Sequence, residues 1–211
     1  MPSEKFNYWF FKKAIPSKIC DDIINLGLDR KPKLAETFGS KAKEVSKKDL
    51  LKTRNSKTVF LNERWIYDMF FPFVYEANKN SSWNYDIDNS EIPQFTIYKK
   101  NQHYVWHQDS DFLTKPYEDK KRKQENGKIR KISVTCQLND PSEFKGGEFE
   151  FDFRNYNPDM RDPKIHEHEV KEIKDKGSII VFPSHTWHRV KPVTKGTRYS
   201  LVIWMLGKPW R

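Results

Sequence analysis

The sequence predicts an α+β fold, in which a double-stranded β-helix (jelly roll) core carries N-terminal helices packed on one of its sheets. The first reason is that apolar residues follow a helical spacing up to residue 78 and a strand-like alternation from residue 92. The second is that several short strand-like segments, separated by turn residues, follow this change. The 211 residues fit one domain, so we expect helical support over residues 1–80 and the jelly-roll core over residues 92–207.

Two amphipathic helices are predicted in the N-terminal part. Ser17 is a suitable cap for the first helix, and Gly27 is a suitable end for it. The apolar residues of this helix lie on one side and are Ile19, Ile23, Ile24 and Leu26. A second helical pattern covers residues 62–78, where Pro72 should kink or split the helix because proline lacks the N–H that an interior turn needs.

Strand-like segments fill most of the C-terminal half. They cover residues 94–100, 104–109, 131–138, 148–153, 167–173, 178–182 and 198–206. The alternation is clearest in 148–153, where three phenylalanines fall on one face and three acids on the other. Residues 139–147 and 111–130 are predicted loops, and the second is long enough to act as a lid or a binding loop.

The positive charge is concentrated in two segments. The net charge is +10, yet residues 31–58 hold nine Lys or Arg against three acids, and residues 115–131 hold eight against three. Lysine-rich runs of this kind are usually solvated loops. A surface that guides an acidic partner is the alternative, and nucleic acid is the less favoured partner because the rest of the chain is almost neutral.

Cysteine usage and hydropathy restrict the class of protein further. Cys20 and Cys136 lie far apart, so a disulfide framework is not indicated, and both fit small buried core residues. No stretch approaches the roughly 18 apolar residues of a membrane span, and the start of the chain lacks the apolar region of a secretory signal. We therefore expect a soluble, intracellular (cytoplasmic) protein that is not bound to a membrane.

His107 and Asp109 lie two residues apart in a predicted strand. Because alternate strand residues point to the same face, they should present an imidazole and a carboxylate side by side. Two His and one carboxylate leave coordination positions open, and they are the ligand set of non-haem Fe(II) oxygenases. His188, in the turn after predicted strand 178–182, is able to supply the third ligand. Taken alone, the His-x-Asp pair also fits a hydrogen-bonded surface pair.

Arg198 follows His188 by ten residues and begins another predicted strand. Alternation places Arg198, Ser200, Val202 and Trp204 on one face, and Tyr199, Leu201, Ile203 and Met205 on the other. A buried guanidinium needs an anionic partner, and its planar fork matches a carboxylate. Arg198 is therefore a candidate carboxylate-binding residue in the same cavity as His188, with an ordinary salt bridge as the alternative.

At these positions the chain resembles the prolyl 4-hydroxylase-like branch of the iron(II)/2-oxoglutarate dioxygenases. The family pattern is His-x-Asp, a distant His, and a basic residue ten positions later. Here it falls on His107, Asp109, His188 and Arg198. The resemblance runs over residues 94–204, about half of the chain, and includes Tyr98, which precedes the first ligand by nine residues.

The resemblance implies that His107, Asp109 and His188 bind Fe(II) and that Arg198 holds the distal carboxylate of 2-oxoglutarate. It also implies that Tyr98 hydrogen-bonds 2-oxoglutarate and that Trp204 walls its pocket, with core packing as the alternative for both. The expected enzyme is procollagen-proline 4-dioxygenase-like, with O2 as a further co-substrate, ascorbate as a reductant and a polypeptide as substrate. Many prolyl 4-hydroxylases of this branch have Lys at the position of Arg198, so the pattern indicates the co-substrate rather than prolyl specificity.

Three other interpretations remain open. His166, His168 and Glu172 give the core of a cupin's first metal motif, although the glycine expected before His166 is missing. A dioxygenase acting on nucleic acid or on a small molecule would use the same ligands, but the nucleic-acid group places its arginine farther from the distal His. A catalytically silent binding module is the third. His103 and His185 lie near the proposed ligands in the sequence and have no assigned role.

Overall fold

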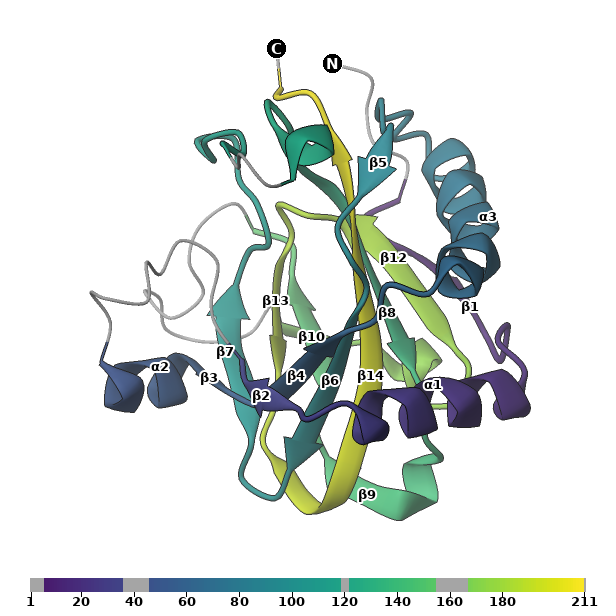
Figure 1. Ribbon diagram of the computed structural model, residues 1–211, viewed down its shortest axis with the longest axis vertical. Coiled ribbons are helices and arrows are strands. Elements are labelled where there is room, and N and C mark those ends of the chain that lie inside the picture. Colours follow the sequence, from purple (N-terminus) through teal and green to yellow (C-terminus); the bar gives the residue numbers. More distant parts are fainter. Residues whose placement is uncertain (1–5, 36–45, 119–121, 155–166, 211) are drawn as a thin grey trace.

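The computed structural model describes residues 6–35, 46–118, 122–154 and 167–210. The helices are α1 (Ser17–Asp29), α2 (Lys47–Thr53) and α3 (Arg64–Asn80), and the short 3-10 helices are η1 (Lys123–Glu125), η2 (Pro141–Glu143) and η4 (Lys171–Ile173). The strands are β1 (Trp9–Phe11), β2 (Lys33–Leu34), β3 (Arg54–Asn55), β4 (Lys57–Phe60), β5 (Asn89–Ser90), β6 (Gln94–Lys99), β7 (His103–His107), β8 (Ile129–Gln137), β9 (Phe144–Gly146), β10 (Phe149–Asp152), β11 (Glu167–Glu169), β12 (Ile179–Pro183), β13 (Trp187–Val190) and β14 (Val193–Gly207). This mixture of helices and antiparallel strands agrees with the predicted α+β class (Figure 1).

The described strands form two antiparallel sheets. The larger sheet has the order β1-β12-β8-β14-β6-β4-β2, and β5 and β9 also pair with β14. The smaller sheet has the order β11-β10-β13-β7-β3. The long strand β14 pairs with β6 on one side and with β8 on the other, so its register is fixed from both edges.

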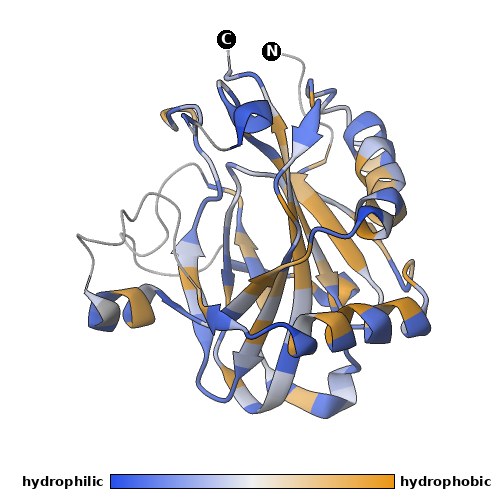
Figure 2. Ribbon diagram, viewed as in Figure 1, coloured by the Kyte–Doolittle hydropathy of each residue, from blue (hydrophilic) through white to orange (hydrophobic). Residues whose placement is uncertain are grey.

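Alternate residues of the larger sheet enter two separate apolar cores. Ile179 and Val181 of β12 belong to a cluster that includes buried residues of α1 and α3. Ile180 and Phe182, from the same strand, belong to a cluster with residues of the smaller sheet. Figure 2 shows that hydrophobic residues gather in the central strands and that the helices carry both hydrophobic and hydrophilic residues. One face of the larger sheet therefore packs on the helices and the other packs on the smaller sheet.

The helices differ from the prediction at three positions. Helix α1 begins at Ser17, which is not its cap, because Pro16 precedes it and makes no side-chain cap hydrogen bond. The helix also continues past Gly27. A Cβ on Gly27 would lie 2.3 Å from Cδ1 of Phe95, so the glycine serves the close approach of α1 to β6. Pro72 does not split α3. Proline has no N–H to donate to the carbonyl of Asp68, but both residues are exposed, so water can take the place of that donor.

Most of the predicted strands are confirmed to within one or two residues, and three segments need correction. Strand β7 ends at His107, so Asp109 lies in the turn that follows and not in the strand. The segment 167–173 is a strand only in β11 and then continues as η4. Strand β13 was not predicted, because Trp187–Val190 shows no alternation of apolar and polar residues.

The two basic segments have different structures. The segment 31–58 is predicted to be a solvated loop, but its described parts contain α2, β3 and β4, and Arg54 of β3 is only 5% exposed. The segment 111–130 agrees better with the predicted loop, since η1 is the only helix or strand in its described residues before β8 begins. Cys20 and Cys136 are both buried thiols of the helix-facing core, as predicted.

None of the helices in the described ranges combines the length and the apolar character that crossing a membrane requires.

Candidate metal centre

The three predicted metal ligands converge where β7 pairs with β13. His188 faces His107 in the antiparallel register, and the N–H of Asp109 donates to the carbonyl of Ser184 (3.0 Å). Nε2 of His107 lies 3.8 Å from Oδ1 of Asp109, and Nε2 of His188 lies 3.5 Å from Oδ2. One ligand atom from each residue lies within 4.8 Å of the other two, which holds for no other such trio of His, Cys, Asp or Glu in the described residues. The turn after β7, and not the strand pleat, brings the carboxylate into place.

The surrounding hydrogen bonds fit a metal-binding site. Nδ1 of His107 lies 2.8 Å from the carbonyl of Val105, and Nδ1 of His188 lies 2.9 Å from the carbonyl of Thr186. A carbonyl only accepts, so each Nδ1 carries the hydrogen and each Nε2 keeps its lone pair for a metal. The hydroxyl of Ser133 donates to Oδ2 of Asp109 (2.7 Å), which orients the carboxylate.

The protonation states also suit a divalent cation. Burial and the neighbouring His188 ring hold the pKa of His107 well below its usual value, and burial likewise lowers the pKa of His188. Burial alone would raise the pKa of Asp109, but His188, His107 and Arg130 together lower it to about 2. At neutral pH the site therefore holds two neutral imidazoles and one carboxylate, the forms that bind a metal.

Metal binding is expected to weaken less between about pH 7.5 and about pH 6.0 than it would with two ordinary imidazoles. Because the pKa values of His107 and His188 are lowered, a smaller share of each ring is protonated in this range than for an ordinary imidazole. Two imidazoles with an ordinary pKa would be partly protonated at the lower pH and would weaken binding roughly tenfold. Calorimetric titration with Co(II) measures the effect, and a tenfold loss would contradict the lowered pKa values.

Aromatic side chains hold the two imidazoles in place. The ring of Tyr104 stacks on His107, with centroids 3.4 Å apart and planes at 13°. The ring of Phe149 lies 5.5 Å from that of His188. Burial raises the pKa of Tyr104 to about 12, so its hydroxyl stays protonated and remains a hydrogen-bond donor. All four residues line one cavity beside the candidate ligands.

Arg198 lies in the same cavity as the candidate ligands. Its side chain is 2% exposed, and within the described residues no carboxylate forms an ion pair with its guanidinium. Burial lowers the pKa of Arg198, and an arginine nevertheless remains protonated in proteins. A buried cation without a protein anion is costly, so the cavity is suited to a ligand that brings a carboxylate.

Tyr98 and Trp204 also line this cavity, and both are buried. Tyr98 pairs with Arg198 across β6 and β14, and its ring centroid lies 5.8 Å from the guanidinium carbon. Nε1 of Trp204 is buried without a hydrogen-bond partner, although indole N–H groups usually find one. The alternation predicted for β14 is confirmed, since Ser200 and Val202 line the cavity while Tyr199 and Leu201 pack on the helix side.

Arg54 was missed by the sequence analysis, which placed it in a solvated segment. Its guanidinium carbon lies 4.7 Å from the ring centroid of Tyr104, and the residue lines the cavity beside His107. The short strand β3 brings it there by pairing with β7. No local pattern could have indicated this, because Arg54 sits among lysines in the sequence.

A second missed group connects the loop 111–130 to Asp109. The hydroxyl of Tyr117 donates to Glu91 (2.6 Å), and Glu91 also accepts from Nη2 of Arg130 (2.8 Å). Nη1 of Arg130 lies 3.8 Å from Oδ1 of Asp109, and its guanidinium stacks at 3.8 Å on the ring of Trp204. In the sequence Arg130 is one of a run of basic residues, and only the folded chain sets it apart.

The cupin motif is not assembled in the described residues. His166 lies outside them. His168 is exposed on β11 and lies 3.0 Å from the hydroxyl of Tyr8, while Glu172 belongs to η4. Neither His168 nor Glu172 lines the cavity beside His107.

The two unassigned histidines lie away from that cavity. Nε2 of His103 is 3.1 Å from the carbonyl of Lys52, so this ring connects β7 to α2. His185 contacts the ring of Phe112 at 5.1 Å and lines a surface pocket beyond the candidate ligands. Both positions fit structural contacts.

The chain is similar in sequence to a known enzyme family. The profile of the 2OG-Fe(II) oxygenase superfamily matches residues 93–206, which is more than half of the chain. A PKHD-type hydroxylase of Xylella fastidiosa (strain 9a5c) is 33% identical over 114 residues, covering 54% of this chain and 43% of that protein. A PKHD-type hydroxylase of Escherichia coli O157:H7 is 30% identical over 114 residues, covering 54% of this chain and 41% of that protein. The chain thus matches less than half the length of these relatives.

Solved structures share the fold. A viral collagen prolyl hydroxylase from Paramecium bursaria Chlorella virus-1, in complex with 2OG, superposes with a TM-score of 0.64 at 20% identity, covering 98% of this chain and 99% of that chain. A prolyl hydroxylase from Trichoplax adhaerens, in complex with a hypoxia-inducible-factor peptide, gives 0.64 at 18% identity, covering 94% and 83%. At these identities the likeness extends to the fold alone.

Proposed function

Because the chain belongs to the 2OG-Fe(II) oxygenase superfamily, we propose that it is an Fe(II)- and 2-oxoglutarate-dependent hydroxylase, similar to prolyl 4-hydroxylases, that acts on a peptidyl substrate. One observation carries this proposal. His107, Asp109 and His188 share a cavity with Arg198, a buried guanidinium that has no carboxylate partner in the described chain. The three ligands would hold the iron, and Arg198 would bind the distal carboxylate of 2-oxoglutarate.

In this assignment the iron and its co-substrate would supply the oxidising chemistry. The protein would bind and orient them and would limit the access of water. The backbone carbonyls of Val105 and Thr186 fix the tautomers of the two imidazoles. Arg198 and the hydroxyl of Tyr98 would orient the distal carboxylate from adjacent strands. Aromatic rings line the cavity and would exclude water from it, which would strengthen the electrostatic contact between a bound carboxylate and Arg198.

A second cavity supports access for a large substrate. It has a volume of about 370 Å³ and adjoins the first, since Tyr104, Asp109 and Trp204 line both. Arg122 and Arg130 lie along its wall, as does Phe60, which is 53% exposed. Glu91, which pairs with Arg130, lines the same cavity, so its wall offers charged groups of both signs beside apolar surface. A polypeptide segment with polar and apolar contacts suits this lining.

A prolyl substrate is part of the proposal because two solved structures that share the fold are named as a viral collagen prolyl hydroxylase and as a prolyl hydroxylase in complex with a hypoxia-inducible-factor peptide. We propose a proline-containing peptide as the substrate and ascorbate as the reductant that restores Fe(II). The basic segments would then steer a polypeptide and would not grip nucleic acid. A protein that makes six phosphate contacts would lose roughly a thousandfold in DNA affinity between about 50 and about 200 mM salt.

The test is to incubate the protein with Fe(II), 2-oxoglutarate, O2 and a set of acidic and basic proline-containing peptides. Mass spectrometry should find one added oxygen on proline, with one succinate released for each, and acidic peptides should react faster. The His107→Ala variant is the control and should give neither product. Oxygenation of DNA oligonucleotides, together with steeply salt-dependent DNA binding, would replace the peptide with nucleic acid as substrate.

A further inference from the structure

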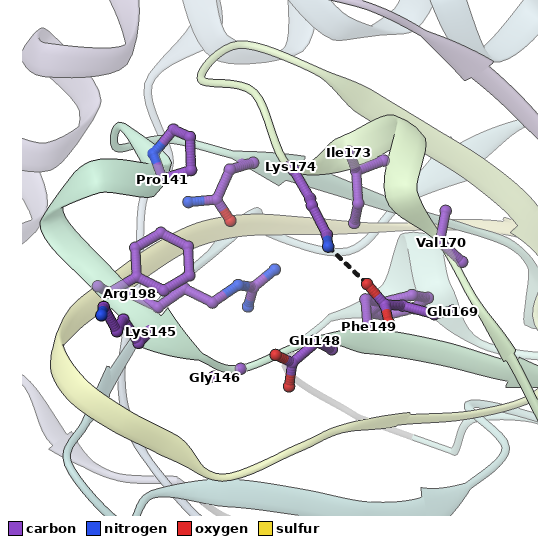
Figure 3. A pocket seen from close by; sticks show the side chains of 13 residues that line it. Pro141, Lys145, Gly146, Glu148, Phe149, Glu169, Val170, Ile173, Lys174 and Arg198 are labelled. Carbon is purple, nitrogen blue, oxygen red and sulfur yellow. Dashed lines mark ion pairs between the residues drawn. The ribbon is translucent and has the colours of Figure 1, made fainter.

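A further pocket, separate from the two cavities described above, opens at Arg198 (Figure 3), and none of the three candidate metal ligands lines it. It has a volume of about 180 Å³. Its lining includes Gln137, Phe144, Ile173 and Lys174, and it shares only Phe149 and Arg198 with the cavity beside His107. The guanidinium of Arg198 is therefore within reach of two separate spaces.

The pocket combines one buried cation with apolar walls. Figure 3 shows the guanidinium of Arg198 directed into it. Gly147 confines this side chain, because a Cβ there would lie 3.0 Å from Cδ of Arg198. Phe144, Val170 and Ile173 supply apolar surface in the same pocket. A ligand for this space needs an anionic head and a short apolar body.

The charges at the rim favour an anion only partly. Lys174 forms an ion pair of 2.6 Å with Glu169, and Lys145 lies exposed nearby. The carboxylate of Glu148 also lines the pocket, but no ion pair joins it to Arg198. The N–H donors of Arg198 are therefore not taken up by Glu148, although its negative charge opposes an incoming carboxylate.

We propose that this pocket binds small monocarboxylates with a short apolar body, which reach Arg198 from a space that none of the three candidate metal ligands lines. The carboxylate pairs with the guanidinium in the bidentate manner that Arg favours, and the apolar body packs on Phe144 and Ile173. One guanidinium carries one positive charge, so the monocarboxylate competes with the distal carboxylate of 2-oxoglutarate. Unlike 2-oxoglutarate, it needs no metal.

Benzoate is a suitable probe, and its neutral isostere benzamide is the control. Calorimetric titration of the metal-free protein should show benzoate binding with a dissociation constant on the order of millimolar, the range open to a ligand of this size. Benzamide should bind at least tenfold more weakly. In the Co(II)-loaded protein, benzoate should raise the apparent dissociation constant of 2-oxoglutarate in proportion to its concentration.

Variants at the rim test the location without disturbing the core. Lys174→Glu should weaken benzoate binding several-fold, whereas Lys171→Glu, the same charge change on an exposed residue of η4 outside the pocket, should not. Glu148→Gln should tighten it, because the opposing charge is removed. Arg198→Met should abolish it.

Benzoate binding that requires the metal, or that survives Arg198→Met, overturns this inference, and so do equal effects of the two lysine changes. The outcome is separable from that of the proposed function. If 2-oxoglutarate is used through Arg198 while benzoate does not bind, only the proposal of a monocarboxylate pocket is wrong. If benzoate binds the metal-free protein while 2-oxoglutarate is not used, only the oxygenase assignment fails.

Discussion

Replacing His107, Asp109 or His188 with alanine is expected to abolish iron binding and, with it, the uncoupled decarboxylation of 2-oxoglutarate. Each residue supplies one of the three ligand atoms that lie within 4.8 Å of one another. Loss of a group that merely orients a ligand costs about 10–100-fold in metal affinity, so loss of a ligand should cost more than about a hundredfold. Metal analysis after dialysis measures the first effect, and succinate release in the absence of a peptide measures the second.

His168→Ala is the matched control for this series. His168 is also a strand histidine, but it is exposed and lies beside Tyr8 rather than in the cavity. Its replacement should leave iron content and decarboxylation near the wild-type values. If His168→Ala removes the iron while His107→Ala retains it, the cupin arrangement is correct and the site proposed for β7 and β13 is wrong.

Arg198→Met is expected to raise the apparent Michaelis constant for 2-oxoglutarate by two or more orders of magnitude. Removing one partner of a buried ion pair costs about 3–5 kcal/mol, and each tenfold change corresponds to about 1.4 kcal/mol. Arg198 is 2% exposed, so solvent does little to weaken the contact. Arg198→Lys should lose less, because the charge remains while the bidentate fork is lost.

Iron binding separates the role of Arg198 from that of the metal ligands. Both Arg198 variants should bind Co(II) as tightly as the wild type, because no metal-ligating atom is changed. A Met variant that uses 2-oxoglutarate at the wild-type Michaelis constant would remove Arg198 from the co-substrate site. A variant that loses metal as well would instead indicate that β14 is displaced.

The sequence predicts the strands that alternate and the side chains they carry. Strand β14 is the clearest case, since its two predicted faces line the cavity and the helix-side core as expected. Such patterns do not reveal residues whose position depends on a partner that is distant in the sequence. Arg54 reaches the cavity only because β3 pairs with β7, and Gly27 lies inside α1 because Phe95 leaves no room for a side chain.

The position of Asp109 shows that the three predicted side chains come together although the predicted local structure is wrong. Spacing along a strand predicts that His107 and Asp109 share a face, yet β7 ends at His107. The carboxylate reaches the ligand position through a backbone hydrogen bond to Ser184, a residue of the β12–β13 connection. The residue types and their spacing can be seen in the sequence. The hydrogen bond that places the carboxylate cannot, because it depends on Ser184, which is distant in the chain.

The pairing of β14 has a consequence for how this protein can change. A slip of one residue against β6 and β8 would exchange the two faces of the strand. Arg198 and Trp204 would turn toward the helices, and Tyr199 and Leu201 would enter the cavity. Such a slip would bury a cation in an apolar core and remove the guanidinium of Arg198 from the cavity in a single step. Substitutions in this strand are therefore expected to be tolerated only if they keep its register, so the requirement to fold also keeps Arg198 in the cavity.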